Sequence, residues 1–308
     1  MNNKTLLCIV GPTGIGKTAL SIAFAKAYKT SIISSDSRQF YREMTIGTAV
    51  PEPEELEAAT HYFIQDRSIL EDYSVGDFER DVVELLPTLF EKNDVVIMVG
   101  GSALYEKAVT HGLDKFPDVS IEIQESLKKE FESKGLSWLQ KELQQIDPKY
   151  YNTVDIHNAH RLLRAVGIYR ASGDKMSDLR SGDAQKRDFK VVKIGLEADR
   201  EDLYDRINRR VDIMLERGLE KEAHELIVHQ HLNALQTVGY KEFFGYFNKE
   251  YNRDEAIRLI KRNTRRFAKR QLTWYRKDTS VKWFHYETRH TEIVQRVSSD
   301  LLMGDNLN

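Results

Sequence analysis

Eight residues near the start of the chain have the types and spacing needed to bind a phosphate group. They fit the pattern Gly-x-x-x-x-Gly-Lys-Ser/Thr and are Gly11, Pro12, Thr13, Gly14, Ile15, Gly16, Lys17 and Thr18. The glycines let the backbone bend until its N–H groups converge, and a helix starting there adds about half a positive charge. Lys17 would reach the terminal phosphates and the Thr18 hydroxyl would hold Mg²⁺. We therefore expect these eight residues to bind a di- or triphosphate, with Thr18 as the metal ligand.

The sequence on both sides of this loop favours a ligand over the alternative, a glycine-rich turn that binds nothing. Residues 6–10 are an apolar run, short enough for a buried parallel strand. Residues 19–27 are rich in helix formers and continue a helix that opens at Lys17. This order of strand, loop and helix is the setting that phosphate binding needs.

A carboxylate follows the next predicted strand. Residues 30–35 form a predicted strand that ends at Asp36, at the carboxyl edge of the sheet, where open α/β sheets bind ligands. There Asp36 could steer Mg²⁺, accept a proton from a nucleophile, or only cap the following turn. The aspartate that most P-loop enzymes carry after another strand is missing, because residues 95–99 end in Gly-Gly-Ser and Asp94 lies at their opposite end. We therefore expect no significant ATP turnover.

The predicted elements alternate between strand and helix in most of the chain, which indicates a parallel sheet. The expected strands are 6–10, 30–35, 95–99, 189–196 and a short one at 283–284; the expected helices are 17–27, 52–59, 77–90, 104–109, 121–135, 138–145, 160–171, 200–217, 219–230, 240–247 and 253–276. From about residue 115 to a polar loop at 173–188, helices follow one another without strands. We predict the α/β class, with a P-loop NTPase-like parallel sheet flanked by helices. Its parts are a core domain of residues 1–115 and 189–290, a helical insertion domain of residues 116–188 and a C-terminal tail of residues 291–308.

Composition narrows the class of protein. The chain has 308 residues, enough for a core domain and a smaller one, and no apolar run approaches the roughly 20 residues of a membrane span. The first predicted strand begins so early that we expect no signal peptide. The one cysteine, Cys8, lies in that strand, where a small buried hydrophobe is expected, and it has no disulfide partner. We expect a cytoplasmic monomer without membrane contact.

Beyond the phosphate loop, an ordered series of motifs resembles the tRNA dimethylallyltransferase (isopentenyl-tRNA transferase, IPP transferase) family. The motifs are Asp36-Ser37-Arg38-Gln39-Phe40-Tyr41, Ile46-Gly47-Thr48-Ala49-Val50-Pro51, Val99-Gly100-Gly101-Ser102-Ala103-Leu104-Tyr105, Arg161-Leu162-Leu163-Arg164-Ala165, residues 206–218, Val238-Gly239-Tyr240-Lys241-Glu242 and residues 266–274. The resemblance covers nearly the whole chain. A phosphate loop alone is shared by many families, whereas this ordered set is specific.

The resemblance implies a prenyltransferase that uses dimethylallyl diphosphate and the anticodon stem-loop of tRNA. In such enzymes the dimethylallyl group moves to N6 of adenosine 37 and diphosphate is released. The amine is a poor nucleophile that needs a proton acceptor, for which Asp36 is placed, while the phosphate loop and Mg²⁺ would stabilise the leaving group. Arg210 matches the family's diphosphate-binding arginine, although an arginine-rich helix surface would also explain it. Ser102 stands where the family usually has threonine, near the reacting amine.

The resemblance also implies which residues contact tRNA. They are Asp36, Ser37, Arg38, Gln39, Gln124, His160, Arg161, Arg164, Gly239, Tyr240 and Lys241. To bring N6 into reach, the adenine must leave its stack in the anticodon loop, at a cost of about a few kcal/mol. Candidates for replacing the lost contacts are Gln39, Phe40 and Tyr41. A plain core position is the alternative for Tyr41.

Some positions depart from the family pattern. Val50 stands where lysine is usual, Gln124 where arginine is usual and His160 where glutamine is usual. Residues 155–159 read Asp-Ile-His-Asn-Ala and lack the proline that the family usually has just before the Arg161-x-x-Arg164 motif. These changes bear on RNA contacts, so the choice of tRNA stays open. A metal site at His157 and His160 is disfavoured, because no cysteine or carboxylate lies at ligand spacing.

A basic segment near the end of the chain predicts how tRNA is held. Residues 258–277 contain nine Lys or Arg and no Asp or Glu. One helix face carries Arg258, Lys261, Arg262, Arg265, Arg266, Lys269 and Arg270; the opposite face, expected to pack on the domain, carries Ile260, Thr264, Phe267 and Gln271. A solvated face would need less charge, and a membrane-surface helix would need bulkier apolar residues. We expect contacts with tRNA phosphates, chiefly from Arg262, Arg265, Arg266, Lys269 and Arg270.

The sequence leaves other functions open. A small-molecule kinase or ATPase would use the same phosphate loop but would need the missing aspartate. Transfer of the prenyl group to free AMP or ADP would need neither the basic helix nor the insertion. A non-catalytic RNA-binding protein would not need Lys17, Thr18, Asp36 and Arg210 together.

Overall fold

The computed structural model describes residues 4–180 and 185–304, which form two compact units. The core unit comprises the described residues up to Thr110 and from Arg187 onward, and the helical unit comprises those from His111 to Lys186. The boundaries between the units therefore lie after residues 110 and 186, whereas the sequence predicts them after residues 115 and 188. Each unit has its own hydrophobic core.

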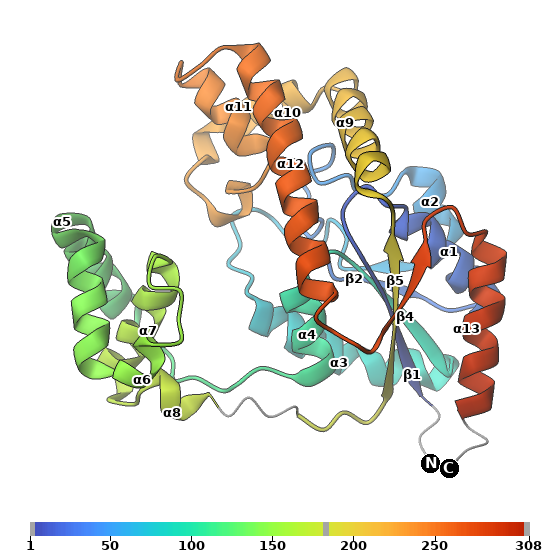
Figure 1. The fold of residues 1–308 in the computed structure, drawn as a ribbon, viewed down its shortest axis with the longest axis horizontal. Helices are drawn as coiled ribbons and strands as arrows, with labels where there is room; N and C mark the ends of the chain where they lie inside the picture. Colours follow the sequence, from blue (N-terminus) through green and yellow to red (C-terminus); the bar gives the residue numbers. More distant parts are fainter. Residues whose placement is uncertain (1–3, 181–184, 305–308) are drawn as a thin grey trace. The chain divides into compact units, whose positions relative to one another are not determined.

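In the described part of the core unit, six strands form a parallel sheet in the order β3-β2-β4-β1-β5-β6 (Figure 1). The strands are β1 (Thr5–Val10), β2 (Ile32–Ser34), β3 (His61–Tyr62), β4 (Val95–Val99), β5 (Lys190–Glu197) and β6 (Val281–His285). In the centre, Leu7 of β1 is in register with Ile97 of β4 and Val192 of β5. The predicted α/β class with a parallel sheet is confirmed. The unexpected strand is β3, because two residues are too short for a periodic pattern.

Helices cover both faces of the sheet, because successive residues of a strand point to opposite sides. On β1, Leu7 packs in the cluster of α1 (Lys17–Tyr28), whereas Cys8 packs in the cluster of α3 (Val75–Lys92) and α4 (Ala103–His111). Both side chains are fully buried, as expected for a strand covered on two faces. Cys8 is thus the buried hydrophobe that the sequence predicts.

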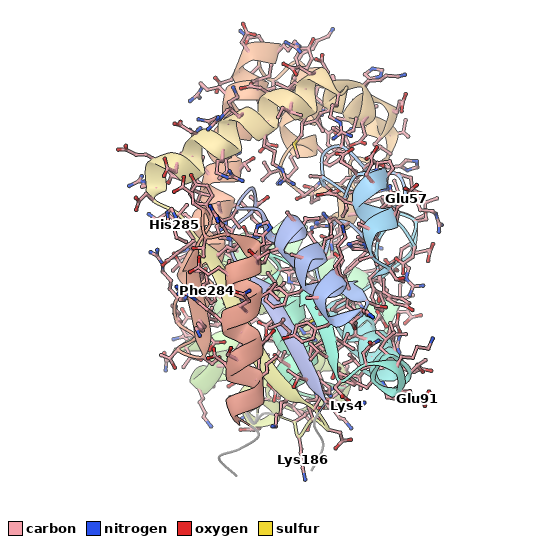
Figure 2. All side chains as sticks on the ribbon, turned by 90° about the vertical axis from the view of Figure 1, so that its right-hand side faces the viewer. Lys4, Glu57, Glu91, Lys186, Phe284 and His285 are labelled. Atoms are coloured by element: carbon pink, nitrogen blue, oxygen red, sulfur yellow. The ribbon has the colours of Figure 1, made fainter. Side chains whose placement is uncertain are left out.

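The end of the chain folds back as α13 (His290–Gly304), so the expected tail at residues 291–308 is wrong. Ile293 and Val297 lie one turn apart and are buried, and the Tyr28 hydroxyl lies 2.7 Å from that of Ser298. As Figure 2 shows, α13 lies beside α1. The helical spacing of these apolar residues is the signal that the expectation of a tail overlooked. Residues 305–308 lie outside the described residues.

Further helices lie over the carboxyl edge of the sheet (Figure 1). They are α9 (Arg200–Glu216), α10 (Leu219–Glu225), α11 (Tyr240–Phe247) and α12 (Arg253–Tyr275), with 3₁₀ turns at Ile227–His229 and Asn233–Leu235. The short helix α2 (Pro53–Ala58) comes earlier in the chain, after β2. Met44, in the loop after β2, is buried among these helices with Tyr240 and Ile260. The loop that follows β2 is therefore held by the helical layer as well as by the sheet.

The helical unit contains α5 (Ile121–Ile146), α6 (Pro148–Tyr151), α7 (Ala159–Ser172) and α8 (Met176–Leu179). Its core includes Leu139 and Leu162, both fully buried. The two helices expected at 121–135 and 138–145 join as α5, and Gly135, at φ 73°, marks the break between them. The loop expected at 173–188 contains α8, and residues 181–184 lie outside the description. No helix of the described residues has the length and apolar character needed to cross a membrane.

Candidate active site

The phosphate loop has a conformation that requires glycine at its first position. Gly11 has φ 137°, and a Cβ there would lie 2.7 Å from the carbonyl oxygen of Leu196 on β5. Gly16 is the N-cap of α1, so Lys17 and Thr18 lie in the first helical turn. A hollow of about 340 Å³, the first hollow, opens there. Of the eight loop residues, those that line it are Thr13, Gly14, Gly16, Lys17 and Thr18; those that are buried and do not line it are Gly11, Pro12 and Ile15.

Lys17 lies in a site where its charge is costly. Its Nζ donates a hydrogen bond to the carbonyl oxygen of Pro12 at 2.8 Å. Burial lowers the pKa of Lys17 from 10.5 to about 8; the Asp36 carboxylate opposes this shift and the Arg210 guanidinium adds to it. An anionic ligand in the first hollow would restore the stability of the ammonium form.

Asp36 follows β2 at the carboxyl edge, as the sequence predicts. Its Oδ1 accepts a hydrogen bond from the backbone N–H of Arg38 at 3.1 Å, so the turn-capping role weighed from the sequence is present. Its Oδ2 accepts no hydrogen bond from any described residue, and Asp36 lines the first hollow. One oxygen therefore positions the carboxylate and the other is available for chemistry.

A second, larger hollow of about 720 Å³ lies between this edge and α12. The residues that line both hollows are Thr13, Asp36, Thr48, Arg210 and Met214. The predicted tRNA-contacting residues that line the second hollow are Asp36, Ser37, Arg38, Gly239, Lys241, Arg266 and Arg270. The two hollows thus meet at a carboxylate and a guanidinium.

Ser102 lies between the end of β4 and α4 and lines the second hollow. Its Oγ accepts a hydrogen bond from the backbone N–H of Ser37 at 3.2 Å and lies 3.1 Å from the Ser37 hydroxyl. Ser37 directly follows Asp36, so these contacts tie the Ser102 hydroxyl to the segment that carries the carboxylate.

Arg210 projects from α9 toward the site. Its guanidinium forms no hydrogen bond or ion pair with the described residues, yet it lines both hollows. Burial lowers its pKa, and the negative charge of Asp36 partly opposes that shift. A partly buried cation without a hydrogen bond or ion pair to the described residues is suited to an anionic ligand, and the alternative of a solvated helix surface does not explain this arrangement.

Comparison with known proteins decides the family. A family model described as IPP transferase matches residues 39–278, more than half of the chain. The chain belongs to the IPP transferase family. The phosphate loop lies outside the matched segment, whereas Ser102 and Arg210 lie within it.

Curated members of the IPP transferase family match nearly end to end. The tRNA dimethylallyltransferase of Christiangramia forsetii is 53% identical over 96% of this chain and 98% of its own. That of Cytophaga hutchinsonii is 50% identical over 92% and 93%. The crystal structure of a tRNA isopentenylpyrophosphate transferase from Bacillus halodurans covers 99% of both chains at 35% identity, with a TM-score of 0.73. A eukaryotic dimethylallyltransferase acting on tRNA, 23% identical, shares the fold over 98% of this chain and 80% of its own, with a TM-score of 0.83.

Two side chains that the sequence did not single out as site residues hold the phosphate loop in place through hydrogen bonds to its backbone. Gln271 of α12 accepts a hydrogen bond from the backbone N–H of Thr13 at 2.9 Å and donates one to the carbonyl oxygen of Gly101 at 2.9 Å. Arg206 of α9 donates to the carbonyl oxygen of Gly14 at 3.0 Å. Both residues lie within the motifs that resemble the family. A contact between residues so far apart in the sequence, however, produces no short-range sequence pattern from which it could be predicted.

Glu222 of α10 is a third residue that sequence reasoning missed. Its carboxylate accepts hydrogen bonds from the backbone N–H groups of Thr45, Ile46 and Gly47 at 3.0, 2.7 and 2.9 Å. The hydroxyl of Tyr240 donates to the same carboxylate at 2.6 Å. Because this loop continues into Thr48, Glu222 fixes a wall that both hollows share.

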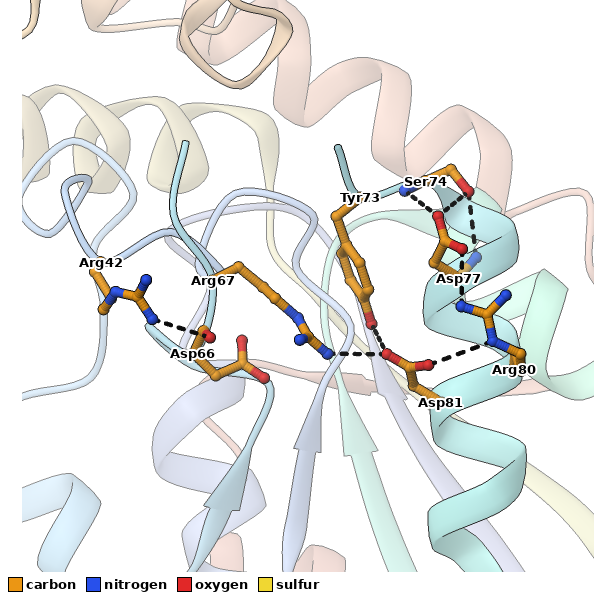
Figure 3. Close-up of polar contacts among 8 residues, drawn as sticks. All are labelled: Arg42, Asp66, Arg67, Tyr73, Ser74, Asp77, Arg80 and Asp81. Carbon is orange, nitrogen blue, oxygen red and sulfur yellow. Dashed lines mark hydrogen bonds and ion pairs between the residues drawn. The ribbon is translucent and has the colours of Figure 1, made fainter. Parts of the chain in front are cut away.

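A polar network around Asp81 fixes the position of Arg67, whose backbone pairs with the segment that follows Asp36 (Figure 3). Asp81 of α3 accepts hydrogen bonds from Arg67 at 2.9 Å and from the Tyr73 hydroxyl at 3.0 Å. Arg67 forms a parallel β-bridge with Tyr41. The chain after Asp36 is therefore fixed by backbone pairing to a segment that α3 anchors.

Burial corrects the predicted RNA contacts of Phe40 and Tyr240 and selects the core position for Tyr41. Phe40 is 1% exposed and Tyr41 6%, and the Phe40 ring lies 5.4 Å from that of Phe78, so both aromatics are core residues that cannot stack on a base. The Tyr240 side chain is fully buried against Glu222, so it does not reach RNA. Gln39 lines the first hollow and not the second, and its amide donates to the carbonyl oxygen of Ala49 at 2.9 Å. Phe40, Tyr41 and Tyr240 therefore shape the site from within the core, whereas Gln39 forms part of the wall of the first hollow.

The basic face of α12 is less uniform than its sequence predicts. Arg258 pairs with Glu255, Lys261 with Asp212, and Arg265 donates to Asn208. Arg258, Arg266, Lys269 and Arg270 are exposed, and the last three form no ion pair with the described residues, while Lys261, Arg262 and Arg265 are partly buried. On the opposite face Ile260 and Gln271 are buried as expected. Phe267 is wrongly placed by the sequence: it is 37% exposed, because Ala256, Ala268 and Tyr275 form the packed face instead.

The remaining predicted tRNA contacts belong to the helical unit. Gln124, His160, Arg161 and Arg164 are all exposed there. The Arg164 guanidinium lies over the ring of Phe116, 5.2 Å from its centroid. Within the described residues no group of three His, Cys, Asp or Glu side chains is arranged for a metal ion.

Proposed function

We propose that this protein transfers the dimethylallyl group of dimethylallyl diphosphate to N6 of adenosine 37 in tRNA and releases diphosphate. One observation carries the proposal: a hollow at the phosphate loop and a larger hollow meet at Asp36 and Arg210. Two substrates that enter separate hollows would react where the hollows join. Membership of the IPP transferase family supports prenyl transfer as the reaction.

The first hollow suits an apolar diphosphate. Its phosphate loop would hold the diphosphate, and its apolar wall, which includes Ile46, Val50 and Met214, would hold the five-carbon chain. Valine at position 50, where the family usually has lysine, makes this wall more apolar. Lys17 and Arg210 would stabilise the negative charge that gathers on the leaving group.

The residues present also fit Mg²⁺. This ion usually binds through one or two protein oxygens together with substrate phosphates and waters, so it needs no cluster of protein ligands. The Thr18 hydroxyl and the Asp36 carboxylate line the same hollow. We assign Thr18 as the ligand; when bound, the ion would neutralise charge on the diphosphate.

Asp36 would accept the proton that the amine loses. As N6 forms its bond to C1 of the donor, the C1–O bond breaks, its electron pair leaves with diphosphate, and a proton passes from N6 to Asp36. Oδ2 is the oxygen free for this step, because Oδ1 accepts from Arg38. The Ser102 hydroxyl would accept or donate a hydrogen bond at the same amine.

The rest of the proposal concerns the macromolecular substrate. tRNA phosphates would lie along Arg266, Lys269 and Arg270 of α12, which are exposed. The helical unit would face tRNA through its exposed residues Gln124, His160, Arg161 and Arg164. A monomeric state and a cytoplasmic location are part of the same proposal.

The test uses the whole protein, dimethylallyl diphosphate, Mg²⁺ and unmodified tRNA. Mass spectrometry of the digested tRNA should show adenosine heavier by one dimethylallyl group in the anticodon loop. Prenylated AMP or ADP in place of prenylated tRNA would favour the free-nucleotide alternative. Phosphate release from ATP that depends on Lys17 would favour a kinase or ATPase, although β4 ends without a carboxylate and Asp94, at its other end, pairs with Lys4 at 2.8 Å.

A further inference from the structure

Three exposed apolar side chains gather at the second hollow. Among the described residues the large hydrophobic side chains that are most exposed are Leu70, Leu104, Ile121, Ile213, Val228, Phe267 and Trp274. Leu104, Phe267 and Trp274, exposed by 50, 37 and 47%, all line the second hollow. Single exposed hydrophobics need no explanation, but a group of them at one opening indicates a binding surface.

The two aromatic residues form a stripe with an arginine. Phe267, Arg270 and Trp274 are three and four residues apart on α12, so they share one face of the helix. The Arg270 guanidinium carbon lies 5.7 Å from the centroid of the Phe267 ring. Leu104 lies on α4, a different element that lines the same hollow. The stripe therefore offers aromatic rings and a guanidinium plane side by side.

The charge around this stripe favours a nucleic acid as the occupant. Arg266 and Lys269 are exposed on the same helix, and residues 258–277 contain no acidic side chain. An apolar protein surface or a lipid surface would be served by the aromatic rings but would not need Arg270 among them. Unstacked nucleobases present flat faces that stack on aromatic rings and on guanidinium groups, and their phosphates match the flanking cations.

We propose that Phe267, Arg270 and Trp274, with Leu104, form a stacking platform for the nucleobases on either side of the extruded adenosine. This inference rests on the proposed function, because it needs an adenosine to enter the second hollow. Extruding that base breaks its stacking on both neighbours. The platform replaces that stacking and keeps the opened loop in one arrangement while the base reaches Asp36 and Ser102.

The experiment measures binding of an unmodified anticodon stem-loop RNA by the whole protein at several salt concentrations. Trp274→Ala and Phe267→Ala should each weaken binding by about tenfold or more, the size expected when one base no longer stacks on an aromatic ring. The slope of log K against log salt should not change, since neither variant removes a cation that binds phosphate. Lys269→Ala is the matched control on the same helix: it should weaken binding and flatten the slope. Trp274→Phe should retain most of the affinity, which separates loss of stacking from loss of folding.

A double-mutant cycle identifies the base that stacks on Trp274. An abasic nucleotide beside the target adenosine should weaken binding to the parent protein but add little further loss to Trp274→Ala. Equal losses in both backgrounds, or parental affinity in Trp274→Ala and Phe267→Ala, would overturn the platform. Prenyl transfer by the parent protein, measured alongside, separates the two ideas: transfer without any effect of these variants rejects the platform alone, whereas absence of transfer rejects the proposed function.

Discussion

At the scale of single residues, the site contains two cationic side chains, Lys17 and Arg210, whose charged forms are destabilised by burial and would be stabilised by an anionic ligand. Lys17, with a pKa lowered to about 8, is partly neutral in mildly alkaline solution. A bound diphosphate favours the ammonium form, so binding above pH 8 must be accompanied by proton uptake. The affinity for dimethylallyl diphosphate should therefore be level below pH 8 and fall by up to about tenfold per pH unit above it.

Calorimetry in two buffers of different ionisation enthalpy checks this prediction, because it counts the protons taken up. Lys17→Arg is the control, since arginine stays charged over the whole range and should bind without pH dependence, whatever its affinity. Equal pH dependence in the parent protein and in Lys17→Arg would show that another group controls donor binding.

Short-range sequence patterns were enough to select three residues that line the first hollow. Lys17 and Thr18 follow from a motif, and Asp36 from its place after a strand. Gln271 could not be found in this way, because its partner Thr13 lies 258 positions earlier. Phe40 is a core residue although the sequence makes it a candidate for RNA contact, because an aromatic side chain has the same pattern in a core and on a binding surface. For Tyr41 the structure selects the core position that the sequence leaves open.

At the scale of elements, the loop between the two hollows depends on α10. Glu222→Gln keeps the shape of the side chain but replaces one acceptor oxygen by a donor, which faces backbone N–H groups. We expect a loss of about 1.5–3 kcal/mol in the free energy of unfolding. The KM values for both substrates should rise, because the loop lines both hollows.

Glu220→Gln is the matched control for this change. Glu220 lies on the same helix and pairs with Arg253 at a partly exposed surface, at 2.7 Å. Removal of that pair should cost less than about 1 kcal/mol and leave both KM values unchanged. Denaturant unfolding and steady-state kinetics measure the two effects; identical behaviour of the two variants would refute a special role for Glu222.

The structure also sharpens what the basic face of α12 should do. Removing Arg266 and Lys269 together should flatten the dependence of log K for tRNA on log salt by about 0.7–0.9 for each phosphate that is no longer bound. Arg258→Ala should change the slope little, because Arg258 is paired with Glu255. Salt titrations of tRNA binding test both expectations, and a larger slope change in Arg258→Ala would move the RNA footprint toward the start of the helix.

Element boundaries show where sequence patterns stop being informative. Long periodic helices such as α12 and buried strands such as β4 were predicted nearly at their observed ends. β3 was missed because two residues carry no period, and α13 because its apolar residues were assigned to a tail. Which face of α12 packs was only partly predicted, since Ala268 and not Phe267 fits against the core.

At the scale of the whole molecule, a buried charge cluster joins distant parts of the core unit. Lys193 of β5 lies 2.9 Å from a carboxylate oxygen of Glu106 and 2.8 Å from one of Asp278, and its side chain is 5% exposed. Lys193→Met should reduce the free energy of unfolding by about 3–5 kcal/mol, because Glu106 is left buried without a cation. Lys282→Met, which removes an exposed pair with Asp300, should cost less than about 1 kcal/mol.

The loss of unfolding free energy in Lys193→Met should depend on pH in a definite direction. Burial alone would raise the pKa of Asp278, but hydrogen bonds from Lys193 and Ser280 lower it from 3.8 to about 2. The stability that this carboxylate contributes is therefore present above its ordinary pKa and is lost as pH falls toward 2. The difference in unfolding free energy between the parent protein and Lys193→Met should narrow over that range. A constant difference would place the cost of the substitution in packing instead of charge.

The general fold was predictable because alternation of strand and helix leaves few topologies for a parallel sheet. The position of the helical insertion was predictable to within a few residues, because strands are absent from it. The meeting of the two hollows at Asp36 could not be predicted from the sequence. It depends on side chains of α9 and α12, which lie more than 150 positions after Asp36 in the chain.

The most direct test of the central claim is the rate of prenyl transfer in a single turnover, with both substrates bound beforehand, in the parent protein and in Asp36→Asn. The amide keeps the shape of the side chain and an oxygen for the N–H of Arg38 but cannot accept the proton from N6. The rate should fall by about 10²–10⁴-fold, while the Kd values for dimethylallyl diphosphate and for tRNA stay within a few-fold. A variant that transfers the dimethylallyl group at nearly the parental rate would contradict the claim that the reaction takes place at Asp36.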